Sequence, residues 1–348
     1  MKKLKARQRL RTIFICGIAV INVALGSRAS IGAIMKAPAH APLAHTTRVI
    51  LLGTGGGPVD RKFRSQTANL LVVDGKPYLI DAGDGVVRQL AWTGYKPDQI
   101  RNIFITHHHL DHNAGLEPLM SFMWSDSNSD GIIHPTFQIY GPPATNYLVH
   151  AALDYLSVSE RIFGSEMKLT PAAPMFSVHE ILNDGLAYRD NVVRVTAAEN
   201  SHYRFKPGSP SYHKDKSYAY RFDTLSGSVV FTGDTGPSVA VTKLAHGADV
   251  LVSEVIDEEA TEKNMQDAWH LSPQLAKQVG FHMAHEHLTP EEVGKMASGA
   301  HVRLVILTHF TPGLDRETDM TGYVSGIHKY FAGPVIAGKD LFEYDLYR

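Results

Sequence analysis

The chain has 348 residues, of which 44% are hydrophobic and 20% charged, and this composition excludes a disordered or low-complexity protein. Its formal net charge of −1 excludes the strong basic excess that is typical of nucleic-acid-binding proteins. Cys16 is the single cysteine, so a disulfide within the chain and a thiolate metal site in the body are excluded too. The 19 histidines stand out more than the charge, and we expect only some of them to have a chemical role.

The first 29 residues have the pattern of a secretory signal peptide. Lysines and arginines crowd positions 2–11, residues 13–25 are mostly apolar, and Ser27 and Ala29 offer small residues at positions −3 and −1 of a cleavage site. The apolar run is short for a membrane core of about 30 Å, although an uncleaved anchor is the alternative. We therefore expect a periplasmic or secreted protein with no membrane segment after cleavage.

Residues 30–46 are rich in Ala, Pro and His and are predicted to be a flexible lead-in to one domain over 47–348. Strands and helices alternate through this domain, beginning with a strand at 49–52 and a hairpin about Asp74-Gly75. Such alternation predicts an α/β layered domain. The remaining predicted strands are 100–105, 137–140, 192–197, 218–222, 229–231, 250–252 and 302–307, and the predicted helices are 86–92, 144–156, 238–246, 272–283 and 289–298.

The segment Thr-His-His-His-Leu-Asp-His at 106–112 follows a predicted strand directly. His107 and His109 are two residues apart and project to the same side of an extended chain. Asp111 and His112 come after the turn and can face a second point. Zinc accepts imidazole nitrogen and carboxylate oxygen, so this loop can supply two ligands to each of two ions, whereas His108 is expected to point away.

A catalytic zinc usually has three protein ligands, so further ligands must come from other segments. Asp234 follows a predicted strand, and a carboxylate can bridge two cations. His309 ends another strand, and His202 follows the strand 192–197. His213 is the local alternative to His202.

Several motifs together resemble the metallo-β-lactamase superfamily, and within it the tRNase Z-like and arylsulfatase-like branch, over most of residues 48–345. The resemblance implies an αββα sandwich, in which two mixed sheets are flanked by helices and the metals lie at one edge. The motifs are Leu52-Gly53-Thr54-Gly55, Asp81-Ala82-Gly83-Asp84-Gly85, His107 to His112, Tyr140-Gly141-Pro142-Pro143, Gly233-Asp234-Thr235 and Leu307-Thr308-His309-Phe310.

The resemblance also implies a role for each candidate. Asp234 would bridge the two ions, Asp111 would in addition orient the attacking water, and Asp81 would orient the ligand loop. His287 opens a segment similar to the family's His-Ser-Thr proton donor, with Leu288 in place of the serine; His282 and His285 are the nearby alternatives. One ion would be held by His107, His109 and His202, and the other by Asp111, His112 and His309.

The sequence therefore predicts an exported hydrolase of a small phosphate or sulfate ester that uses a metal-activated water and two Zn²⁺ ions, with Mn²⁺ or Fe²⁺ as alternatives. A lactone or another ester is the alternative substrate, and a metal-loaded binding protein is the alternative class. We do not expect nucleic acid as a partner, because the charge is near zero and we find no long basic arm; a homodimer is compatible with the sequence. Substrate contacts are expected from residues 117–190, where Met120, Phe122, Met123 and Trp124 form either a pocket or part of the core.

Overall fold

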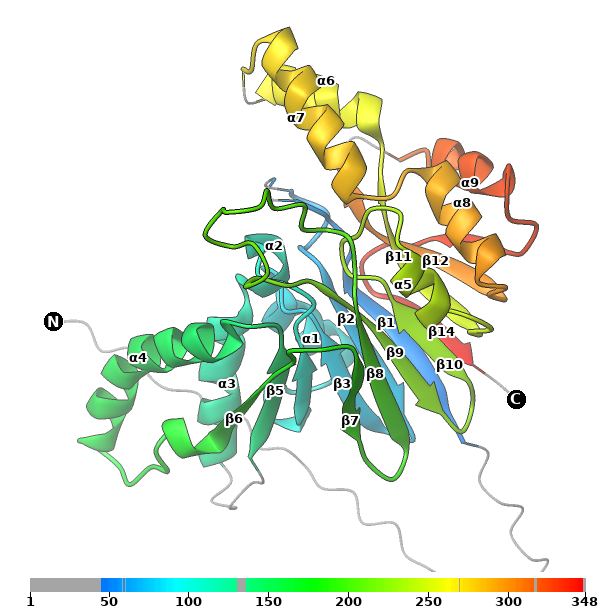
Figure 1. Ribbon diagram of the computed structural model, residues 1–348. Helices are drawn as coiled ribbons and strands as arrows, with labels where there is room; N and C mark the ends of the chain where they lie inside the picture. The colour runs from blue at the N-terminus through cyan, green and yellow to red at the C-terminus, as the bar shows by residue number, and fades with distance from the viewer. Residues whose placement is uncertain are drawn as a thin grey trace, which may run out of the picture. The chain divides into compact units, whose positions relative to one another are not determined.

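Two mixed seven-stranded β-sheets form the body of the protein in the computed structural model (Figure 1). The structure describes residues 45–57, 59, 61–129, 136–268, 270–315 and 318–346. The predicted signal peptide and nearly all of the lead-in lie outside these residues, so both remain predictions. Within the described part of the chain, no helix is both long and apolar enough to cross a membrane.

The first sheet has an antiparallel part, which contains the first and the last strand of the described chain, and a parallel part. The predicted hairpin about Asp74-Gly75 joins β2 and β3, with Val73 opposite Lys76. The strands are, in spatial order, β14 (Phe342–Leu346), β1 (Thr47–Gly53), β2 (Ala68–Val73), β3 (Lys76–Ile80), β4 (Asn102–Phe104), β5 (Phe137–Gly141) and β6 (Phe176–Glu180).

The second sheet has a similar division between antiparallel and parallel pairs. Its strands are, in spatial order, β13 (Val335–Ala337), β12 (Leu304–Thr311), β11 (Val250–Ile256), β10 (Ser228–Phe231), β9 (Tyr218–Thr224), β8 (Val193–Glu199) and β7 (Gly185–Arg189).

The longer helices lie outside the two sheets. The shortest helical turns are connections between strands. One helical hairpin, α6–α7, projects away from both sheets (Figure 1). The helices are α1 (Val86–Thr93), α2 (Leu110–Asn113), α3 (Leu116–Ser129), α4 (Thr145–Gly164), α5 (Val239–Leu244), α6 (Glu258–Ala268), α7 (Pro273–Glu286), α8 (Pro290–Gly299) and α9 (Thr321–His328), with 3₁₀ turns η1 (Pro97–Gln99) and η2 (Ala173–Met175).

Side-chain alternation along the strands builds three apolar layers. In β1, Val49 and Leu51 belong to the core between the sheets, whereas Ile50 and Leu52 belong to the core that includes residues of α1, α3 and α4. A strand that is buried on both faces has a continuously apolar sequence, because successive side chains point to opposite sides. A third core joins the second sheet to α5, α8 and α9. The predicted αββα sandwich is therefore confirmed.

The sequence prediction omitted α3, α6, β6 and β7. Helix α6 has the sequence EEATEKNMQDA, which has little apolar periodicity, so its pattern indicated no buried face. Met120, Met123 and Trp124 of α3 are buried in the first core, and Phe122 is exposed. The core alternative is therefore confirmed for Met120, Met123 and Trp124, whereas Phe122 does not belong to that core.

Candidate metal centre

The candidate site lies where several strands end at one edge of the two sheets. Strand β4 leads into His107, β8 leads into His202, β10 leads into Asp234, and His309 belongs to the last residues of β12. Ligands in α/β proteins commonly bind outside the carboxyl ends of strands, where loops bring distant residues together.

Asp81 fixes the loop that carries most of the candidate ligands. This buried carboxylate accepts hydrogen bonds from the backbone N–H of Thr106 at 2.7 Å and from the Thr106 hydroxyl at 2.9 Å. It also accepts a hydrogen bond from Nδ1 of His112 at 2.8 Å. A carboxylate bound to Nδ1 sets the tautomer and orientation of the ring, so Nε2 of His112 faces the site. The structure thus places Asp81 in the orienting position that was expected of it.

His107, His109, His202 and Asp234 form the first group, in which the candidate ligand atoms all lie within 4.8 Å of one another. Nε2 of His202 lies 3.0 Å from Nδ1 of His109, and Nε2 of His107 lies 3.7 Å from Oδ2 of Asp234. The Nδ1 atom of His202 is bound to the carbonyl oxygen of Glu286 at 3.0 Å, which leaves Nε2 for the site.

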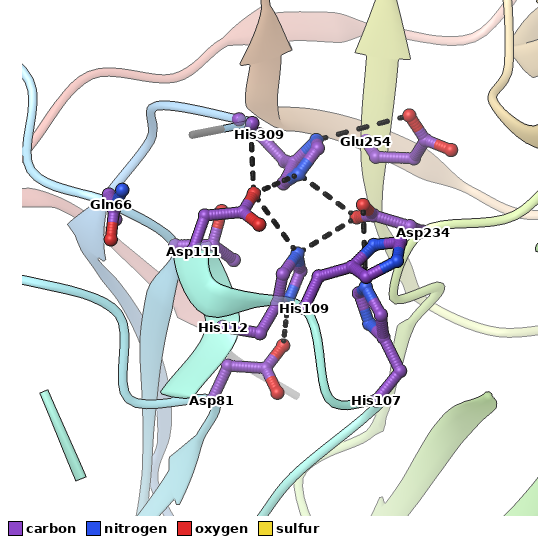
Figure 2. Close-up of polar contacts among 12 residues, drawn as sticks. Gln66, Asp81, His107, His109, Asp111, His112, Asp234, Glu254 and His309 are labelled. Atoms are coloured by element: carbon purple, nitrogen blue, oxygen red, sulfur yellow. Dashed lines mark hydrogen bonds and ion pairs between the residues drawn. The ribbon is translucent and has the colours of Figure 1, made fainter. Parts of the chain in front are cut away.

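Asp111, His112, His309 and Asp234 form the second group. Nε2 of His309 lies 3.1 Å from both Oδ2 of Asp111 and Oδ1 of Asp234, and Nε2 of His112 lies 3.2 Å from the same Oδ1. Figure 2 shows Asp234 between the two groups, with His112 and His309 on one side and His107 on the other. One carboxylate oxygen therefore faces each group, as a bridging ligand requires.

Several buried polar atoms in this cluster fit two cations. Nε2 of His107, Nε2 of His112 and Oδ1 of Asp234 have no hydrogen-bond partner among the described residues. Such atoms are costly to bury unless a ligand satisfies them. Burial lowers the pKa of His107 and His109, and that of His202 to about 3, so these rings are neutral and each has one ring nitrogen with a lone pair. The donor set of imidazole and carboxylate suits a transition-metal ion.

His287 lies beside the cluster, with its ring centroid 5.0 Å from that of His202. Its Nδ1 atom donates a hydrogen bond to Oε2 of Glu254 at 2.9 Å, and Oε1 of Glu254 accepts from the backbone N–H of Thr235 at 2.8 Å. Burial by itself lowers the pKa of His287, but the charge and hydrogen bond of Glu254 outweigh burial and raise it. The ring is therefore oriented, and its proton is retained more tightly than in an ordinary histidine.

Sequence reasoning missed Glu254. A signal was present, because Glu254 is the charged residue in β11, whose other residues are apolar except Ser253, and the structure buries it there. Buried carboxylates are rare unless they are paired. The capping box between Thr289 and Glu292, which the sequence indicated, begins α8 two residues after His287 and supports its position.

The structure also separates the alternative histidines from the cluster. The ring of His108 points to the hydroxyl of Thr145, with Nε2 at 3.3 Å, as expected for a residue outside the ligand set. His213 is exposed and lies against Tyr212 with the two rings tilted, and His285 binds the carbonyl of Phe281 through Nδ1. The side chain of His282 is outside the described part of the structure.

A cavity of about 330 Å³ opens onto the cluster. Met283 and Glu286 of α7 form part of its wall, so α7 contributes to the site. We expected substrate contacts from residues 117–190, and none of the residues that line this cavity belongs to that range. Its lining residues are Gly57, His109, Leu110, Asp111, His202, Asp234, Met283, Glu286, His287 and Thr311.

Comparisons with known proteins agree with this geometry. A family model described as beta-lactamase superfamily domain matches residues 77–310. Ribonuclease Z of Mycobacterium sp. (strain KMS) is 31% identical over 267 residues, which cover 76% of this chain and 84% of that protein. Ribonuclease Z of Mycobacterium avium (strain 104) is 29% identical over 298 residues, which cover 84% and 96% of the two chains.

Solved structures share the fold. The metallo-beta-lactamase fold protein YhfI from Bacillus subtilis superposes with a TM-score of 0.60 at 18% identity, over 86% of this chain and 99% of its own. The short form of human tRNase Z superposes with a TM-score of 0.57 at 22% identity, over 86% and 100%. The chain belongs to the metallo-β-lactamase superfamily, in its tRNase Z-like branch. With its buried His/Asp cluster, it is a metal-dependent hydrolase of this fold.

Proposed function

We propose that the protein hydrolyses phosphate diesters at a centre of two divalent cations, with zinc as the first candidate and Mn²⁺ or Fe²⁺ as alternatives. The observation that carries the proposal is Asp234, whose two oxygens each face a separate group of three further candidate ligands. Two bound cations would lower the pKa of a water and neutralise charge on the ester. His107, His109 and His202 would hold one cation, and Asp111, His112 and His309 the other.

The remaining groups of the site handle orientation and protons. Oδ2 of Asp111 accepts a hydrogen bond from the backbone N–H of Gly57 at 2.6 Å, so this carboxylate is fixed where it can orient the attacking water. Nδ1 of His287 is engaged by Glu254, and the residue lines the cavity, so Nε2 is the atom that donates a proton to the leaving oxygen. His287 therefore acts as general acid, and Glu254 positions it.

A phosphodiester is preferred to a sulfate ester or a lactone because the curated relatives are named ribonuclease Z. Those names also make an RNA substrate the second candidate. A small diester is the first candidate, because the α6–α7 hairpin, of which α7 lines the cavity, carries five acidic residues against two lysines. A polyanionic RNA backbone is repelled by such a surface, whereas a small ester need not contact it.

The test uses zinc-reconstituted protein and a panel of bis(p-nitrophenyl) phosphate, p-nitrophenyl sulfate, an aryl lactone and a precursor tRNA. We expect turnover of the diester and much weaker turnover of the sulfate and the lactone. Preferred cleavage of precursor tRNA at its 3′ side would establish the second candidate. Protein that carries both metals and turns over none of the four would be a binding protein, which contradicts the proposal.

A further inference from the structure

A second cavity, of about 290 Å³, shares His109 as a lining residue with the cavity described above. Its volume is close to the lower end of ordinary ligand pockets, about 300 Å³. His109 lines both cavities, so a substrate at the metal centre can reach into each. The second cavity is lined by His108, His109, Ala144, Tyr147, Leu148, Tyr203, Phe205 and Asp215.

The walls of the second cavity are mainly aromatic. The ring of Tyr203 lies 5.5 Å from that of His109 and 4.8 Å from that of Phe205, so a row of rings leads away from the metal centre. Tyr147, in the first turn of α4, is 74% exposed and faces the same cavity. A large exposed aromatic side chain beside an active site is a ready stacking surface for a planar ring.

The position of the general acid assigns a different ester group to each cavity. His287 lines the first cavity, so the leaving group that receives its proton lies there. A diester carries a second group, which stays bonded to the phosphate. This group must extend away from the metal centre in a direction different from that of the leaving group. The second cavity provides that direction past His109.

We propose, on the basis of the phosphodiesterase function proposed above, that the second cavity is a subsite. It binds the nucleobase of the group that remains on the phosphate. Tyr147, Tyr203 and Phe205 supply stacking surfaces, and the Asp215 carboxylate accepts a hydrogen bond from a ring amino group. A plain aryl ring has no donor for Asp215, which favours a nucleobase. The preferred substrate is thus a nucleotide ester with a small leaving group.

The test compares two substrates with one leaving group: the p-nitrophenyl ester of adenosine 5′-phosphate and methyl p-nitrophenyl phosphate. Base stacking predicts that KM is about tenfold lower for the nucleotide ester. Tyr147→Ala should bring the two KM values together. Tyr155→Ala is the matched control, because Tyr155 is 70% exposed on the same helix and lies outside the cavity; it should leave the ratio of the KM values as in the wild type.

Asp215→Ala removes the hydrogen-bond acceptor and tests the subsite independently of stacking. It should raise KM more for the adenosine ester than for the corresponding thymidine ester, because thymine has no amino group. If the wild type hydrolyses both phosphate esters with equal KM and Tyr147→Ala changes neither value, the subsite is disproved and the phosphodiesterase function stands. If metal-loaded wild type hydrolyses neither ester, the phosphodiesterase function itself is disproved.

Discussion

Nδ1 of His287 and Oε2 of Glu254 lie 2.9 Å apart although the residues are 33 positions apart in the chain. The whole α6–α7 hairpin separates them, and both side chains are buried at its base. This contact links the proton donor His287 to a carboxylate whose Oε2 also lies 4.0 Å from Nδ1 of the candidate ligand His309.

Replacing Glu254 with Gln should lower kcat while the metals remain bound. Glu254 raises the pKa of His287, so its loss lowers that pKa. The acid form of His287 is lost as pH rises through its pKa, and the alkaline limb of the pH–rate profile should therefore move to lower pH. Glu259→Gln, on the exposed surface of α6, is the control and should keep the wild-type profile. If the alkaline limb of Glu254→Gln does not shift, Glu254 does not position His287.

His287→Ala should reduce turnover without loss of metal. General acid catalysis contributes about 10²–10⁴-fold, and the reduction should be larger for an alkyl leaving group than for nitrophenolate, which departs without a proton. Rates on two such esters, with metal content measured in parallel, check this expectation. His285→Ala, a histidine of α7 that lies outside the candidate ligand groups, is the control. Equal losses on both esters would make His287 a structural residue.

Elemental analysis of zinc-reconstituted protein should find about two ions per chain. Asp234→Ala should reduce the content at both positions, because both groups share this carboxylate, whereas His309→Ala should reduce it mainly at one. Chelation should lower Tm, and added zinc should restore it, since a ligand that binds only the folded state stabilises that state. Asp154→Ala, exposed on α4, should keep both ions. Retention of two ions by Asp234→Ala would exclude Asp234 as the bridge.

We further propose that the protein is exported and cleaved near Ala29, on the basis of the basic, apolar and small-residue succession at its N-terminus. N-terminal sequencing of the protein isolated from its native host, together with cell fractionation, is the measurement. The expected product begins close to Ser30 and is found outside the cytoplasm. A product that keeps Met1 and fractionates with the cytoplasm contradicts the proposal.

The sequence by itself was enough to predict an α/β layered domain and the candidate ligands, and the resemblance of its motifs to the metallo-β-lactamase superfamily implied the sandwich. Strand alternation and the spacing of His107, His109, Asp111 and His112 are local properties, and local geometry dictates which side of an extended chain a residue faces. Asp234 and His309 could be added because each follows or ends an apolar strand, and the ends of such strands meet at one edge.

Only the tertiary structure decided which histidines join the cluster and what supports them. His202 lies near His109 in space but 93 residues away in the chain, and no local pattern separates it from His213. Glu254 acquires its role only because β11 places it against His287, and Tyr147 only because α4 packs beside the 203–216 loop. These relationships depend on how the sheets and helices pack, and packing is determined by the summed burial of distant apolar faces rather than by any short segment.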